Sequence, residues 1–182
     1  MSVRRGILQS AAMVAVLAMA GPVAGQGSPL SVEGRTGITF ATGDLSDAGA
    51  GSGPLFAVDL ILNVDRALSL YGGWAYHQFG CDACGETLSA SGPRLGVKAL
   101  FHTPGDALPW VRAGATYNEF DGLGAGSDRA LGLEAGAGID YALSDRVSIT
   151  PAARYETFSP EFGGGTATVS YLTLDLGIHL HF

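Results

Sequence analysis

Apolar and polar side chains alternate along this chain with a period of two residues. The last segment shows it most clearly: every even position from Leu172 to Phe182 is apolar, and every odd position from Tyr171 to His181 is polar or small. This alternation predicts a β-strand with one apolar and one polar face. Beyond residue 25, no apolar run approaches the roughly 18 residues that would indicate a membrane-spanning helix.

The same alternation recurs along the chain and predicts eight strands. The eight segments begin near Leu30, Phe56, Leu68, Arg94, Val111, Leu131, Val147 and Ser170. We expect strands of about 10 to 13 residues, long enough for the roughly 9 to 11 tilted residues that cross a bilayer. Soluble strands usually have only about 5 or 6 residues. Strand length therefore favours a membrane barrel over a soluble sandwich.

Glycine content and connection lengths support the same prediction. The chain has 28 glycines in 182 residues, and many lie on the polar faces, which is typical of a narrow interior filled with side chains. Long external loops and short periplasmic turns are typical of outer-membrane barrels. The sequence therefore predicts an all-β fold, an eight-stranded antiparallel up-and-down transmembrane β-barrel. Its expected long connections are 43–54, 80–91, 121–129 and 158–168, and its shorter ones are 65–67, 102–109 and 143–146.

The N-terminal residues carry the features of an export signal. Arg4 and Arg5 precede an apolar stretch, which a glycine–proline pair separates from small residues that end at Gly25. This order predicts a cleaved secretory signal peptide over residues 1–25 and a mature barrel domain over residues 26–182. The apolar stretch is shorter than the roughly 20 residues of a transmembrane helix. The expected location is the outer membrane of a Gram-negative cell envelope.

The charge pattern excludes one class of function and predicts what fills the lumen. Ten Lys and Arg against 17 Asp and Glu give a formal net charge of −7, which leaves no basic excess for binding nucleic acid. On the polar faces, acids and bases nearly balance, and charges in a confined lumen need partners because desolvation is costly. We predict an ion-pair network that plugs the lumen, formed by Glu33, Arg35, Asp59, Arg94, Lys98, Arg112, Glu134, Asp140, Arg154, Glu156 and Asp175.

Two further groups of side chains are expected at the ends of the barrel. Outward-facing aromatic residues should form two girdles at the membrane interfaces. The long loops are acidic, which predicts a solvated rim or, as a sharper hypothesis, a site for calcium or magnesium that bridges lipid phosphates. The expected girdles consist of Phe40, Phe56, Tyr76, Tyr117 and Tyr155 on the loop side, and of Phe101, Tyr141 and Phe182 on the turn side.

Few residues are candidates for catalysis, metal binding or disulfide formation. Cys81 and Cys84 are expected to form a disulfide within one loop, because an exported protein meets oxidants and two cysteines cannot complete a four-ligand zinc site. His179 and His181 point the same way, and polar filling of the lumen is favoured over a transition-metal site. His77 and Glu156 lie on inward faces near the outer rim, but no diagnostic serine–histidine–acid spacing accompanies them. We therefore expect no catalytic residue, no cofactor and no metal.

The end of the chain resembles a known family. The sequence Asp175-Leu176-Gly177-Ile178-His179-Leu180-His181-Phe182 resembles the C-terminal β-signal of outer-membrane proteins, with Asp175, Gly177, Leu180 and Phe182 as its characteristic positions. Residues 136–146 are similar to a strand–turn–strand of the OmpA-like and OmpX-like small barrels. The resemblance implies a barrel in the outer-membrane lipid bilayer, inserted by the barrel-assembly machinery with the help of periplasmic chaperones. The expected state is a monomer.

These observations lead to one expected function and two alternatives. We expect an integral outer-membrane barrel with a structural or surface-interaction role and a lumen plugged by side chains, since eight strands leave an interior just wide enough for side chains. The first alternative is a passive, porin-like channel for small solutes, as in OmpW-like barrels. The second is an outer-membrane enzyme that modifies lipids.

Overall fold

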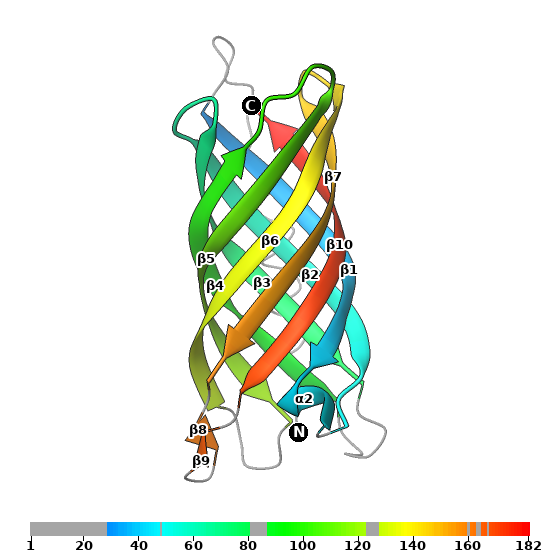
Figure 1. Ribbon diagram of the computed structural model, residues 1–182, viewed down its shortest axis with the longest axis vertical. Coiled ribbons are helices and arrows are strands. Elements are labelled where there is room, and N and C mark those ends of the chain that lie inside the picture. Colours follow the sequence, from blue (N-terminus) through cyan, green and yellow to red (C-terminus); the bar gives the residue numbers. More distant parts are fainter. Residues whose placement is uncertain are drawn as a thin grey trace, which may run out of the picture.

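The main feature of the structure is a closed antiparallel barrel. The structure is a computed structural model, and it describes residues 29–47, 49–80, 87–122, 128–159, 161–162, 165–166 and 168–182. Eight strands form the barrel in the order β1-β10-β7-β6-β5-β4-β3-β2, and each strand pairs antiparallel with its neighbours (Figure 1). Barrel strands that follow one another in the sequence lie side by side, and the first strand pairs with the last to close the barrel. The predicted eight-stranded up-and-down barrel is therefore confirmed.

The barrel strands contain 12 to 17 residues each: six fall within the expected 10 to 13 residues, and the other two, Ala107–Asp121 and Asp128–Ser144, are longer, with 15 and 17 residues. The apolar–polar alternation marks only the part of a strand that has an apolar outer surface. Backbone pairing continues beyond it, because paired strands satisfy their hydrogen bonds equally well next to water. The strands are β1 (Leu30–Thr42), β2 (Ser52–Asn63), β3 (Leu68–Phe79), β4 (Leu88–Leu100), β5 (Ala107–Asp121), β6 (Asp128–Ser144), β7 (Val147–Phe158) and β10 (Val169–His181).

The two ends of the barrel differ in their connections. At one end, here called the turn end, the chain reverses through residues 64–67, 101–106 and 145–146, and both Leu30 and Phe182 lie there (upper end in Figure 1). At the other, called the loop end, the connections are 43–51, 80–87, 122–127 and 159–168. The predicted alternation of shorter and longer connections is present, although the longer strands shorten most of them.

Two small elements at the loop end were not predicted. One is a helical turn, α2 (Asp44–Asp47), and the other is a ribbon formed by β8 (Glu161–Phe162) and β9 (Gly165–Thr166). Elements of two to four residues are too short to show a periodic pattern in the sequence. Among the described residues, no helix is long and apolar enough to cross a membrane.

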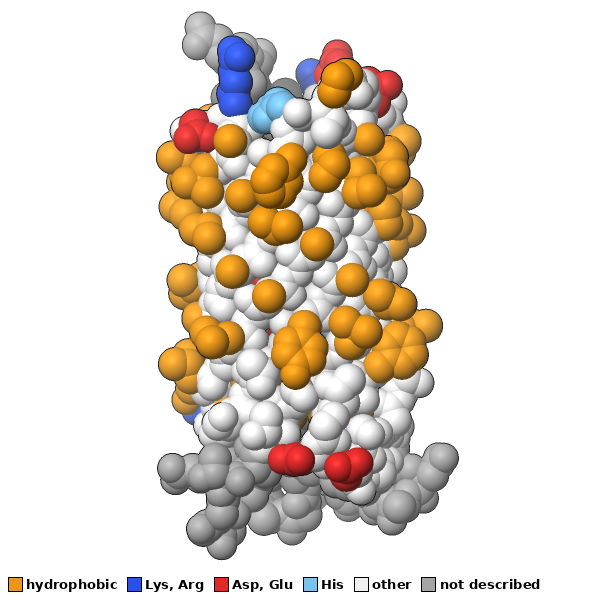
Figure 2. All heavy atoms as spheres, in the orientation of Figure 1, with side chains coloured by type: hydrophobic (Ala, Val, Ile, Leu, Met, Phe, Trp, Pro, Cys, Tyr) orange, Lys and Arg blue, Asp and Glu red, His pale blue; other side chains and the backbone are white. Residues whose placement is uncertain are grey.

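The outer surface of the barrel is apolar around its middle. In Figure 2, hydrophobic side chains cover the central part of the molecule and charged ones gather near its two ends. Leu95, Leu131 and Leu133 are each about two-thirds exposed, a degree that is unfavourable for large apolar side chains in water. All eight aromatic residues expected in the two girdles are exposed on the outer surface.

Inward-facing glycines make room for large side chains that cross the lumen. A side chain at Gly96 or Gly114 would collide with the hydroxyl group of Tyr71, and one at Gly138 would collide with the indole ring of Trp110. The expectation that these glycines serve a narrow, filled interior therefore has a direct structural basis. They lie where the large side chains of Tyr71 and Trp110 cross the lumen.

Candidate functional site

The lumen is where the candidate functional residues meet. All eleven charged residues predicted for the lumen point inward, and none is more than 7% exposed. They project from seven of the eight barrel strands. The remaining strand, β3, contributes Tyr71 and His77, which are also buried.

Arg112 is the centre of one group of contacts in the middle of the lumen. Its guanidinium lies 3.2 Å from a carboxylate oxygen of Asp59 and 3.0 Å from one of Glu134. Arg94 binds the other carboxylate oxygen of Asp59 at 2.9 Å. The hydroxyl group of Tyr71 donates a hydrogen bond to Glu134, and its ring lies 4.5 Å below the Arg112 guanidinium. Two carboxylates are thus bridged by two guanidinium groups.

A second group of contacts surrounds Arg35 and Arg154. Arg154 binds Asp175 directly and lies 3.3 Å from Glu33. Arg35 lies 3.3 Å from Asp175 and 3.2 Å from Asp59. Because Asp59 also belongs to the first group, Arg35 joins both groups into one continuous network.

The network extends toward the turn end through Lys98 and Asp140. The ammonium of Lys98 lies 2.7 Å from Asp140 and 4.0 Å from Glu33. The other oxygen of Asp140 accepts hydrogen bonds from the Trp110 indole at 2.8 Å and from the Thr150 hydroxyl at 3.0 Å. Each buried charge in this part has an opposite charge within ion-pair distance. This is the condition for tolerating the desolvation cost of buried charge.

Glu156 pairs with His77 instead of with a lysine or arginine. A ring nitrogen of His77, Nε2, lies 3.5 Å from Glu156, and Nδ1 shares a 3.0 Å hydrogen bond with the hydroxyl group of Thr39. Glu156 also accepts a hydrogen bond from the Tyr171 hydroxyl at 3.0 Å. Asn118 donates to that same hydroxyl at 2.9 Å.

The contact between His77 and Glu156 bears on the enzyme alternative. Thr39, His77 and Glu156 form a hydroxyl–imidazole–carboxylate series, but none of them is more than 1% exposed. Thr39 also shares its hydroxyl with Thr173 at 3.1 Å. A nucleophile needs room for a substrate beside it. In the present packing, this series is a set of buried polar groups without room for a substrate.

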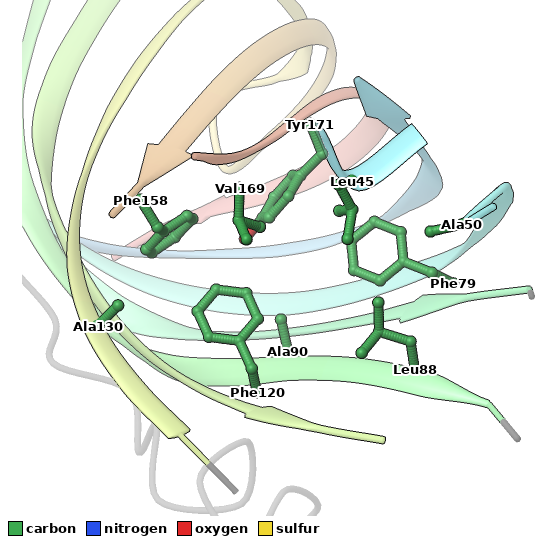
Figure 3. Packing of buried hydrophobic residues seen from close by; sticks show 10 residues of the cluster. All are labelled: Leu45, Ala50, Phe79, Leu88, Ala90, Phe120, Ala130, Phe158, Val169 and Tyr171. Atoms are coloured by element: carbon green, nitrogen blue, oxygen red, sulfur yellow. The ribbon is translucent and has the colours of Figure 1, made fainter. Parts of the chain in front are cut away.

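An apolar cluster fills the lumen at the loop end, and the sequence reasoning missed it. The rings of Phe79 and Phe158 lie 5.3 and 5.7 Å from that of Tyr171, and Phe120 meets Phe158 edge-on at 5.1 Å. These rings point toward one another across the barrel, and Leu45 reaches them from α2 (Figure 3). We call this group the loop-end apolar cluster. It consists of Leu45, Ala50, Phe79, Leu88, Ala90, Phe120, Ala130, Phe158, Val169 and Tyr171.

A hydrogen bond fixes the position of α2 over the mouth of the barrel. Asp44 at its start accepts a hydrogen bond at 3.2 Å from the backbone N–H of Thr168, which lies in the fourth loop. Leu45, the next residue, is only 4% exposed because it packs into the loop-end apolar cluster. α2 is therefore tied both to the fourth loop and to side chains inside the barrel.

The remaining predicted residues are placed as follows. Asp175 and Gly177 of the C-terminal strand face the lumen, and Phe182 lies exposed at the turn end. Cys81, Cys84 and the predicted signal peptide lie outside the described residues. The disulfide, the signal peptide and the C-terminal assembly signal stay predictions.

Comparison with known proteins bears on the fold. No known family model matches the chain, and neither does any curated protein. Among solved structures, Neisserial surface protein A (NspA) aligns with a TM-score of 0.69 and 17% identity, over 87% of this chain and 100% of that chain. The chain has the fold of the small outer-membrane barrels.

Two further solved structures share this fold. The N-terminal β-barrel domain of Pseudomonas aeruginosa OprF aligns with a TM-score of 0.56 and 15% identity, over 86% of this chain and all of that chain. Ail, the attachment invasion locus protein of Yersinia pestis, was solved in complex with the heparin analogue sucrose octasulfate. It aligns with a TM-score of 0.54 and 15% identity, over 87% of this chain and all of that chain.

Proposed function

We propose that this chain is an integral outer-membrane barrel with a structural or surface-interaction role, and that its own side chains close its lumen. The observation that carries the proposal is the filling of the lumen by two successive layers. The ion-pair network occupies the middle, and the loop-end apolar cluster covers it. Tyr171 connects the layers, because its ring packs in the cluster and its hydroxyl binds Glu156.

The outer surface supports insertion into a bilayer. The apolar belt and the two aromatic girdles are the features by which outer-membrane barrels meet lipid. The predicted export signal over residues 1–25 and the C-terminal strand agree with delivery to the outer membrane and with assembly by the barrel-assembly machinery after passage with periplasmic chaperones. We propose a monomer with the turn end in the periplasm and the loop end outside.

The filled lumen argues against the passive-channel alternative. An eight-stranded barrel has an interior just wide enough for side chains, so a solute path requires side chains to move aside. In the middle, movement of Arg112 would remove one of the buried guanidinium groups that Asp59 and Glu134 share, and at the loop end Leu45 and the aromatic rings would have to separate. Both events carry a large free-energy cost.

The acidic loop end bears on the kind of surface partner. The four loop connections contain Asp44, Asp47, Asp82, Glu86 and Glu161 but no lysine or arginine. The related fold of Ail was solved with a polysulfated ligand, which needs basic groups on its receptor. A rim of like charge repels a polyanion. We therefore propose that a surface ligand of this chain is neutral or cationic.

A swelling assay tests closure of the lumen. The purified protein is reconstituted into liposomes, and swelling is followed in isosmotic solutions of small sugars and amino acids. We expect liposomes that contain the unmodified protein to swell at the same rate as protein-free liposomes. The positive control combines Arg94→Ala and Glu134→Ala with Phe120→Ala and Phe158→Ala, which open both layers and should raise the rate. Swelling that increases with the amount of unmodified protein would contradict closure.

Heat-modifiable migration on a gel and membrane fractionation accompany this assay. A folded barrel should migrate faster before boiling than after it, and the protein should fractionate with the outer membrane. Recovery of the folded protein in the soluble fraction would contradict the proposed location.

We also propose that the chain is not an enzyme, because His77 and Glu156 are sealed beneath the loop-end apolar cluster. Mass spectra of lipid A from cells with and without the protein test this directly. We expect identical spectra. A mass shift that appears with the protein and disappears in the His77→Gln variant would establish the enzyme alternative.

A further inference from the structure

Two histidines at the turn end form an arrangement that the ion-pair network does not explain. His179 and His181 occupy alternate positions of β10, so both face the same side, and their ring centroids lie 4.1 Å apart. His179 is almost fully buried, whereas His181 is half-buried at the mouth of the lumen. Neutral imidazole is the commonest protein ligand of transition metals.

Each histidine forms a hydrogen bond with a serine through one ring nitrogen. Nε2 of His179 lies 2.7 Å from the Ser31 hydroxyl, and Nε2 of His181 lies 3.0 Å from the Ser148 hydroxyl. In the strand register, Ser31 stands opposite His181, and Ser148 stands opposite His179. Each ring therefore reaches diagonally to the serine opposite the other histidine. Hydrogen bonds of this kind fix the orientation and tautomer of metal-binding histidines.

The second nitrogen of His179 lacks a partner. Its Nδ1 is buried and has no hydrogen-bond partner among the described residues. Buried polar groups are nearly always satisfied, and an exception calls for an unseen water or ion. When Nε2–H donates to the serine oxygen, Nδ1 carries the lone pair that a metal requires.

Charged groups of both signs lie near the pair. Lys98, the nearby base, lies 2.7 Å from Asp140 and 4.0 Å from Glu33, so its charge is compensated by two carboxylates. The described residues contain no cluster of three or more histidine, cysteine or acidic side chains arranged for a metal. A metal site here would offer two imidazole nitrogens, and water entering beside the half-exposed His181 would have to complete its coordination shell.

We propose that His179 and His181 form a binding site for a divalent transition metal at the turn end of the lumen, with Nδ1 of each ring as ligand and Ser31 and Ser148 as orienting residues. Among divalent first-row metals, Cu²⁺ binds nitrogen ligands most tightly, and two imidazoles suit Cu²⁺, Ni²⁺ or Zn²⁺. The site is open on the side of the half-exposed His181, at the turn end, and the metal enters from there.

Titration with Cu²⁺ tests the site. The full-length protein is purified in detergent with Cys81→Ser and Cys84→Ser in every sample, so that thiols cannot bind the metal, and binding is measured by calorimetry. We expect one equivalent of tight binding, weakened by at least about tenfold in either His179→Gln or His181→Gln. The matched control is His102→Gln, which removes an exposed histidine in a turn and should leave the affinity unchanged.

Electron paramagnetic resonance provides the second measurement. Bound Cu²⁺ should show hyperfine coupling to two imidazole nitrogens in the parent and to one in His181→Gln, a half-exposed position where substitution is compatible with folding. Ser148→Ala should weaken binding by about tenfold through loss of orientation. Equal affinity in the parent and in the His179→Gln/His181→Gln double variant, or the same loss in His102→Gln, would overturn the proposal.

Discussion

The middle of the lumen and its loop end are filled by opposite kinds of side chain. In the middle, five bases and five acids form a connected network in which each charge depends on another. At the loop end, aromatic and aliphatic side chains pack without charge. In the proposed closed barrel, the two layers would exclude solutes in different ways. Ion pairs bind strands together through specific partners, whereas the apolar layer excludes water by contact alone.

The two layers should respond differently to mutation. Removing one charge leaves its partners buried and uncompensated, and the cost exceeds the value of the pair itself. Removing one ring leaves a cavity, and the cost depends on how far the neighbours collapse. The charged layer should therefore show strong coupling between its members, and the apolar layer should tolerate a conservative change of shape.

The largest effect is expected at Arg112. Arg112→Ala removes one of the two guanidinium groups that bridge the buried Asp59 and Glu134, and unfolding in urea should show a loss of about 3 to 5 kcal/mol. The matched control is Arg129→Ala, because Arg129 lies 3.0 Å from Glu119 on the exposed surface. There we expect a loss of about 0 to 1 kcal/mol. Equal losses at the two positions would remove the special role of the buried network.

A comparable effect is expected in the loop-end apolar cluster. Phe158→Ala removes a ring that is 1% exposed and contacts Phe120 and Tyr171, and the loss should be about 3 to 5 kcal/mol in the same unfolding measurement. Phe158→Leu keeps most of the volume and should cost less than about 1.5 kcal/mol. If leucine were as costly as alanine, packing would not be the source of stability at this end.

A smaller effect is expected when an arginine is introduced on the outer, lipid-facing surface of the barrel. Leu176 lies on the outer surface of β10, next to Asp175, which faces the lumen and binds Arg154. Leu176→Arg should destabilise the barrel in lipid vesicles by about 2 to 4 kcal/mol, the range for arginine on a lipid-facing surface near mid-membrane. Ser52→Arg, an exposed position at the loop end, serves as control with about 0 to 1 kcal/mol. A similar small effect at both positions would contradict a lipid-facing belt.

The smallest effect measures coupling inside the network. Lys98 and Asp140 form a close pair, so Lys98→Met and Asp140→Asn should each destabilise the barrel, and their double variant should lose less than the sum. A double-mutant cycle should give a coupling energy of about 0.5 to 3 kcal/mol. The pair Phe79→Leu and Leu88→Met, chosen from the apolar layer, should be closer to additive. Strong coupling in the apolar pair and none in the charged pair would contradict the expected difference between the two layers.

The sequence was sufficient for the barrel, and its alternation also indicates which charged residues face the lumen. Strict alternation placed Glu33 and Arg35 on one face of β1 and the apolar residues on the other, because a strand presents successive side chains to opposite sides. Which charges contact each other depends on strand tilt and on the register across the barrel. Neither can be read from one strand at a time.

The apolar layer was missed for a different reason. Phe79, Phe120 and Phe158 continue the inward parity of His77, Asn118 and Glu156 on their strands, so the signal was present. Phe158 fell in a predicted connection, and Phe79 and Phe120 stood at the last positions of predicted strands, where an apolar residue on the polar face has no place in a simple alternation. Leu45 gave no signal at all, because a single leucine in a four-residue helical turn has no periodicity.

Single-channel recording in a planar bilayer tests closure of the lumen most directly. Four folded proteins are compared: the parent, Arg94→Ala/Glu134→Ala, Phe120→Ala/Phe158→Ala, and the combination of all four substitutions. Since the two layers lie in series, we expect the parent and both double variants to be silent and only the combined variant to open. Discrete, reproducible openings of the parent would contradict a lumen closed by its own side chains.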